Sequence, residues 1–135
     1  MTSASWAVQQ AVFATLSTSE AVRDLAGERV FDAVPRGAAF PYIVVGDASE
    51  TNASTATEQA SEHALEIRIW SRCGGTREIK QVACAVRDAL DGAELALDGH
   101  TLVDLRFTSA DFARETDGET YRAVLRFRAL TEPGE

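Results

Sequence analysis

The sequence predicts a single α+β domain, residues 1–135, in which a mainly antiparallel sheet carries helices on one face. Three segments, residues 65–70, 103–108 and 121–129, alternate apolar and polar side chains with the two-residue period of half-exposed strands. Residues 76–90 instead follow the helical period. The predicted strands outnumber the helices available to connect parallel neighbours, so most strand pairs are expected to be antiparallel.

The N-terminal segment predicts two helices. In the first, over residues 5–17, Ser5 is the expected N-cap. Its apolar residues recur at four-residue intervals, with two aromatic residues alongside: Val8, Val12, Leu16, Trp6 and Phe13. Thr18 and Ser19 offer caps for a short second helix over residues 20–26.

Two extended segments and a long polar segment follow. Residues 30–34 predict a short extended stretch, and the β-branched run at 40–46 predicts a strand covered on both faces. Residues 48–61 contain no large apolar side chain, so we expect a flexible loop that is disordered or binds a partner. Its candidate contacts are Glu50, Thr51, Asn52 and Glu58.

The second half predicts a strand, a helix and a set of hairpins. The helix starts at Thr76, the expected N-cap, and ends at Gly92. The dipeptides at 98–99 and 117–118 are Asp-Gly, which marks tight turns before the strands at 103–108 and 121–129. In the first of these strands Val103, Leu105 and Phe107 are expected to point inward, and the tail from about residue 132 is expected to fray.

The charge of the chain argues against general nucleic-acid binding. The net charge is −8, and residues 1–61, 62–100 and 101–135 each carry net negative charge. Binding to phosphates relies on Lys and Arg, so no segment is suited to holding nucleic acid, although DNA passing through an assembly is compatible with this balance. Lys80 is the only lysine. The arginine excess has two interpretations, a GC-rich genome or protein–protein interfaces.

No residue pattern predicts catalysis, a cofactor or a metal site. The two histidines, His63 and His100, lie in no recognised nucleophile context, and with the two cysteines they form no metal-binding spacing. The glycines before Thr76 belong to no phosphate-binding motif. We expect Cys73 and Cys84 to be buried or partly buried free thiols, with a disulfide as the alternative.

The outward face of the predicted sheet is the stronger candidate for function. Alternation places charged side chains there together with a large aromatic, Trp70. Trp and Arg are enriched where proteins meet, whereas the alternative is a solvated face of mixed charge. The candidate contacts to another subunit or partner, which we expect to meet opposite charges on neighbouring subunits, are Arg68, Trp70, Arg106, Arg126 and Arg128.

Five sequence blocks in this order and spacing resemble a known family. They are RVFDAVP at 29–35, AFPYIVVGD at 39–47, IRIWSRCGG at 67–75, LALDGH at 95–100 and DGETYRAVLRFRA at 117–129. The chain is similar nearly from end to end to the tail completion, or tail terminator, proteins of long non-contractile phage tails and of gene transfer agents.

The resemblance implies a structural protein and not an enzyme. It implies a homo-oligomeric, hexameric ring at the head-proximal end of the tail tube, which contacts the tube protein and the neck or stopper proteins while DNA only passes through the lumen. Assembly would take place in the bacterial cytoplasm, without a membrane, and the mature location would be the tail–neck region. The alternatives are another neck or tail ring component, such as a stopper or tube subunit, and a small ligand-binding domain.

Overall fold

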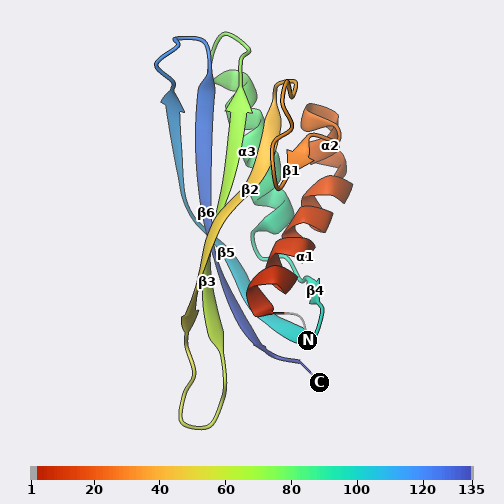
Figure 1. Ribbon diagram of the computed structural model, residues 1–135, viewed down its shortest axis with the longest axis vertical. Helices are drawn as coiled ribbons and strands as arrows, with labels where there is room; N and C mark the ends of the chain where they lie inside the picture. Colours follow the sequence, from red (N-terminus) through yellow and green to blue (C-terminus); the bar gives the residue numbers. More distant parts are fainter. Residues whose placement is uncertain (1–2, 135) are drawn as a thin grey trace.

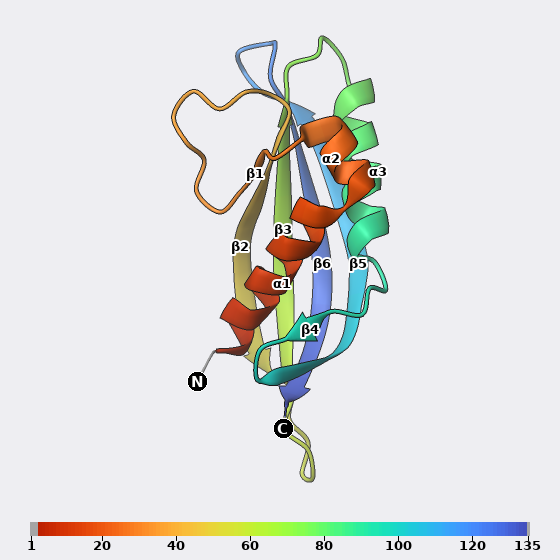
Figure 2. The ribbon, with the colours of Figure 1, turned by 90° about the vertical axis from the view of Figure 1, so that its right-hand side faces the viewer.

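The computed structural model describes residues 3–134 and has two layers, a twisted sheet and a layer of helices (Figure 1). The strand order is β1-β2-β3-β6-β5-β4, and every neighbouring pair is antiparallel except β1 with β2. Helices α1 (Ala4–Thr18), α2 (Glu20–Ala26) and α3 (Arg77–Leu90) cover one face (Figure 2). The predicted α+β class is confirmed. The strands are β1 (Val30–Phe31), β2 (Tyr42–Asn52), β3 (Ser61–Ser71), β4 (Ala96–Leu97), β5 (His100–Arg114) and β6 (Tyr121–Pro133).

The caps of the helices differ from the predicted caps at two of three positions. Ser3, and not Ser5, is the N-cap of α1, and its Oγ accepts a hydrogen bond from the Trp6 N–H at 3.1 Å. Ser19 caps α2 as predicted. Thr76 occupies the N-cap position of α3, but its side chain makes no capping hydrogen bond, so the prediction of a threonine cap is wrong.

The core lies between α1, α3 and the covered face of β3 and β6. The predicted helical stripe of α3 is fully buried, and so is the stripe Val8, Val12 and Leu16 of α1. The alternating apolar residues of β3 and β6 meet these stripes, and Phe127 is the largest fully buried side chain. Each large apolar side chain buried in this way contributes about 1.5–3 kcal/mol. The layers are therefore held together by the periodic residues that identified the elements.

Two predictions about the sheet are wrong. Ile43 and Val45 are buried, whereas Tyr42 and Val44 are only half-buried, because β2 is covered by helices on one face alone. We call the uncovered side of the sheet the open face. Val103 was expected to point inward but is 49% exposed, because the β5–β6 register shifts between Leu102 and Asp104. A local bulge of this kind re-aims one side chain without changing the strand.

The polar segment at 48–61 is a hairpin arm, not a long loop. β2 continues to Asn52 and pairs there with Ser61 of β3, which leaves only residues 53–60 as the connection. Within it, the Ala53 N–H donates to the Ala60 carbonyl at 2.9 Å. We call residues 48–61 the arm, and its connection extends past the helices at the lower end of Figure 1. In the C-terminal tail, which was expected to fray from about residue 132, β6 runs to Pro133, and Glu135 lies outside the described residues.

Candidate interaction surfaces

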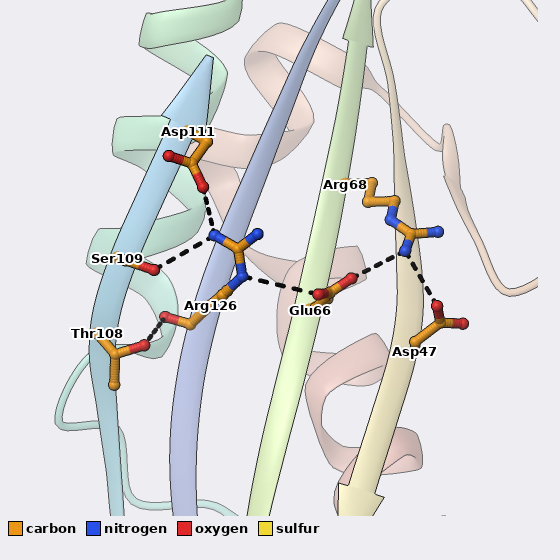
Figure 3. Close-up of polar contacts among 7 residues, drawn as sticks. All are labelled: Asp47, Glu66, Arg68, Thr108, Ser109, Asp111 and Arg126. Carbon is orange, nitrogen blue, oxygen red and sulfur yellow. Dashed lines mark hydrogen bonds and ion pairs between the residues drawn. The ribbon is translucent and has the colours of Figure 1, made fainter. Parts of the chain in front are cut away.

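An alternating ladder of charged residues crosses the open face of the sheet. Strand pairing places Glu66 of β3 opposite Arg126 of β6, with Arg68 two residues further along β3. Figure 3 shows these side chains joined to one acidic residue at each end, so that the order across four strands is Asp47, Arg68, Glu66, Arg126 and Asp111. We call these five residues the charge ladder.

The central carboxylate of the charge ladder has more ion-pair contacts and is less exposed than the carboxylates at its ends. The Arg68 Nη2 group lies 2.9 Å from a Glu66 carboxylate oxygen and 3.0 Å from Asp47. The other Glu66 oxygen lies 3.7 Å from Arg126 Nε, and the Arg126 guanidinium also contacts Asp111. The Glu66 side chain is 29% exposed, against 83% for Asp47. Since exposed pairs contribute little, most of the stabilisation of the ladder must come from Glu66 and its two arginines.

The remaining arginines predicted as contacts also lie on the open face and have partners within the chain. Arg128 of β6 pairs with Glu62 of β3. Arg106 of β5 pairs with Asp104 two residues earlier, at 2.9 Å. Each of these arginines therefore has an acidic partner within its own chain, and its contact with an acidic residue of a neighbouring subunit stays a prediction.

Trp70 belongs to an aromatic cluster at one end of the open face. Its ring stacks on Tyr42 with centroids 6.4 Å apart, and the Phe40 ring centroid lies 5.2 Å from that of Tyr42. The guanidinium of Arg72 lies over Phe40 at 4.5 Å, and that of Arg122 over Trp70 at 6.0 Å. Burial raises the pKa of Tyr42, so its hydroxyl stays protonated. Half-buried aromatics flanked by arginines are typical of protein contact sites.

The turn between β5 and β6 closes beside this cluster. Asp117 accepts hydrogen bonds from the Thr120 hydroxyl at 2.6 Å and from the N–H groups of Thr120 and Glu119. Hydrogen bonds that favour the charged carboxylate lower its pKa, and these, with the nearby Arg72, bring the pKa of Asp117 to about 2. The turn predicted from Asp-Gly is thus fixed by a side chain as well as by glycine.

The other predicted contacts lie on the arm. Glu50, Thr51 and Asn52 lie in β2, Glu58 lies in the connection, and all four are exposed. Asn52 also orders the connection, since its side chain accepts a hydrogen bond from the Ser54 N–H at 3.0 Å. The strand register puts the arm at the opposite end of β3 from Trp70. Thr51 nevertheless lines one depression of the open face together with Arg126 and Arg128, so the arm contacts adjoin the arginines and are distant only from Trp70.

The residues with chemical potential do not converge on a site. His63 is fully buried, with Nε2 2.9 Å from the Thr131 hydroxyl and Nδ1 without a partner. Burial lowers the pKa of His63, which keeps its ring neutral. No group of three His, Cys, Asp or Glu residues within 3–134 is placed to hold a metal ion. Cys73 and Cys84 are free but exposed, so the prediction of buried thiols is wrong.

Sequence reasoning missed two apolar surfaces at the edges of the sheet. Trp6 and Phe13 of α1 are 48% and 39% exposed and line a groove with Val45. At the opposite edge Phe112 of β5 is 39% exposed, with Lys80 Nζ 5.2 Å from its ring centroid. One signal was available: Trp6 and Phe13 lie off the four-residue stripe of α1.

The described helices include none long and apolar enough to cross a membrane.

Comparison with known proteins gives consistent results along most of the chain. Residues 10–132 match the protein family described as tail completion protein gp17. Tail completion protein gp17 of Bacillus phage SPP1 is 26% identical over 126 residues, which cover 93% of this chain and 92% of that protein.

Two solved structures share the fold. A chain in the virion of a native gene transfer agent particle superposes with a TM-score of 0.90 and is 33% identical, covering 98% of this chain and 99% of its own length. The structure of SPP1 gp17 superposes with a TM-score of 0.62 at 23% identity, covering 93% of this chain and 89% of its own, which supports the likeness of fold.

Proposed function

Because this chain belongs to the family of tail completion protein gp17, we propose that it is a structural protein that completes the tail of a phage-like particle or gene transfer agent. In this proposal several copies, six in the complete assembly, form a ring at the head-proximal end of the tail tube. The ring stops growth of the tube and presents a surface to the neck proteins. The observation that carries the proposal is the likeness, over nearly the whole of both chains, to a chain of a gene transfer agent virion.

The geometry supports a role in contacts. A protein that joins a tube to a neck needs two separate surfaces, and the chain offers the arm at one end of β3 and the aromatic cluster around Trp70 at the other. The connection of the arm reaches beyond the helices with small and polar side chains, which suits it to lie against a neighbouring ring. We propose the tail tube protein and a neck or stopper protein as partners of these surfaces.

The charge distribution suits a passage for DNA. The arginines of the charge ladder, Arg68 and Arg126, are paired with carboxylates, and the whole chain carries net negative charge. Tight binding of DNA requires cations that are free to neutralise phosphates. We propose that DNA passes through the lumen of the ring without being held. Assembly would take place in the bacterial cytoplasm, and the mature position would be the tail–neck region.

Electron microscopy of particles from cells that lack this chain tests the proposal. We expect tails that are overlong or not joined to heads, and we expect the chain supplied from a plasmid to restore joined particles. Tails of normal length that are joined to heads in its absence would contradict the proposal. Blocked tube assembly, with no tails at all, would point to a tube subunit.

A further inference from the structure

The groove beside α1 is an apolar surface with nothing packed on it. It is lined by residues of α1, of the β1–β2 connection and of β2: Trp6, Gln9, Gln10, Phe13, Asp32 and Val45. It is open because β1 pairs only with Ile43 and Val44, so that β2 beyond this point has no strand on its outer side. Exposed Trp and Phe side chains beside a free strand edge are typical of a surface that another protein covers.

The opposite edge of the sheet carries an apolar ridge. Phe112 of β5 projects beside α3, with Lys80 over its ring, and Arg114 lies over Tyr121 at 5.2 Å. Here too the strand edge is free, because β4 pairs only with His100 and Thr101. Beside this free edge, the turn after α3 covers β5, and the Phe107 N–H donates a hydrogen bond to the Asp91 side chain there. The ridge is therefore formed by Phe112, Lys80 and Arg114 at the end of β5 that nothing covers.

The groove and the ridge are complementary. Both have aromatic side chains, but the charge of the groove is acidic, from Asp32, and that of the ridge is basic, from Lys80 and Arg114. None of these three charges has an ion-pair partner among residues 3–134, in contrast to the arginines of the open face. Bringing the two surfaces together would cover exposed aromatic rings and pair charges that are otherwise unpaired.

We infer that the groove of one copy receives the ridge of a second copy of this chain. The inference rests on the proposed function and specifies the surfaces that would build the ring. The two surfaces lie on opposite edges of one sheet, as β2 and β5 do in Figure 2. A contact between different surfaces is heterologous and repeats from copy to copy, so it generates a closed ring when the rotation closes.

Cross-linking in assembled particles tests this contact with a native cysteine as reporter. Cys84 is exposed on α3 one turn after Lys80, on the side of the ridge. In a Cys73→Ser background, Gln10→Cys adds a second thiol in the groove. Treatment of purified particles with a flexible bismaleimide is expected to give a ladder of linked copies on a denaturing gel. Gln9→Cys is an alternative groove position.

Matched controls separate this contact from others. The same particles with Cys84 alone, with Gln10→Cys but Cys84→Ser, or with Val103→Cys in place of Gln10→Cys are expected to give no ladder. Val103 is similarly exposed but lies outside the groove. If particles whose chain carries both Cys84 and Gln10→Cys give no series of linked copies, the inference is overturned. So would linkage of Gln10→Cys to a different particle protein, which would identify another occupant of the groove.

A charge exchange gives a second test. Asp32→Lys or Lys80→Asp alone is expected to reduce incorporation of the chain into particles several-fold, whereas both changes in one chain restore it. Equal loss in the double variant would overturn the inference. If these tests fail but particles without the chain still have unjoined or overlong tails, only the inferred contact is wrong, and the proposed function is still supported.

Discussion

At the scale of single residues, His63 is the buried group with the clearest consequence for stability. It is buried in β3 just after the arm, where its neutral ring is hydrogen-bonded to the Thr131 hydroxyl. A sequence reading finds His63 at the start of a strand but cannot show that it is enclosed, because burial there depends on α1 and on strands distant in the chain.

We predict that His63 makes the protein acid-sensitive. Its pKa is lowered on folding from about 6.5, so the unfolded chain binds the proton first as pH falls. Its contribution to the stability of the fold is therefore complete above pH 6.5 and is lost as pH falls below that value, by at most about 1.4 kcal/mol per pH unit. Urea unfolding between pH 7.5 and 5 measures this loss.

The matched comparison is His63→Gln against His100→Gln. His63→Gln removes the titrating group but keeps a polar side chain, so its free energy of unfolding should fall less steeply over this pH range than that of the unmodified chain. His100→Gln, at the half-buried second histidine, removes a smaller cause of the lowered pKa of His63 than burial, so it should keep most of the steep fall. Equal slopes in the unmodified chain and His63→Gln would show that His63 does not set the acid sensitivity.

At the scale of elements, the charge ladder depends on its central carboxylate. Glu66→Gln leaves Arg68 and Arg126 close to each other without the negative charge between them. We expect the free energy of unfolding to fall by about 1 kcal/mol at low salt, near the upper end for partly exposed pairs. The loss should shrink in 1 M NaCl, where charges are screened within about 3 Å. Thermal and urea unfolding at both salt concentrations check this.

The control for this substitution is Glu58→Gln in the connection of the arm, where no ion pair is formed. It should change stability by less than about 0.5 kcal/mol at either salt concentration. A salt-independent loss in Glu66→Gln would mean that the packing of its side chain, and not its charge, stabilises the sheet.

The arm is the element whose removal should separate folding from function. We predict that replacing residues 54–59 by Asn-Gly, a favoured two-residue hairpin turn, changes the free energy of unfolding by less than about 1 kcal/mol. All six residues replaced are exposed, so no core contact is lost. Far-ultraviolet circular dichroism and urea unfolding measure the fold, and counts of joined particles in electron micrographs measure function.

Fewer joined particles with an intact fold are the expected result for the shortened arm. Normal joining would show that the connection makes no essential contact, and unfolding would show that the arm stabilises the domain. Replacement of residues 54–59 by a Gly-Ser sequence of equal length separates the effect of length from that of the side chains.

At the scale of the whole molecule, alanine substitutions of two phenylalanines on neighbouring strands should differ sharply in how much they lower the free energy of unfolding. Phe127 is buried in the central strand where both layers meet, whereas Phe112 is exposed on the ridge. Phe127→Ala is expected to cost about 3–5 kcal/mol, a large part of the 5–15 kcal/mol that stabilises a typical domain. Phe112→Ala should cost less than about 1 kcal/mol in the isolated chain. Urea denaturation of both variants measures the difference, and similar losses would contradict the exposed placement of Phe112.

The parts of the fold that follow a regular period could be predicted from the sequence. The stripe of α3 and the alternation of β3 and β6 determined both the elements and the face to which Arg68 and Arg126 belong. The arm could not be predicted, because its strands are paired through the backbone and carry Ser, Thr, Asn and Glu, whose pattern resembles a loop. Val103 was misplaced because a bulge shifts the period locally.

The candidate surfaces could be predicted only in part for a related reason. Alternation along one strand identifies outward side chains, but the partners of those side chains lie on other strands. Arg68 meets Asp47 and Arg126 meets Asp111 because of the register between strands, which no single segment contains. The groove and the ridge depend in the same way on how α1 and α3 lie across the sheet.

The charge ladder has a consequence for how β3 and β6 find each other. If β6 slipped along β3 by two residues, the apolar side chains would still face the helices, so hydrophobic burial alone discriminates poorly against this error. In the native register Arg68 lies opposite Val124. A slip in one direction would place it opposite Arg126, and a slip in the other would place it opposite Arg122. Like charges directly opposite each other are unfavourable. Arg68 therefore disfavours both misalignments and helps to select the native register of the two central strands.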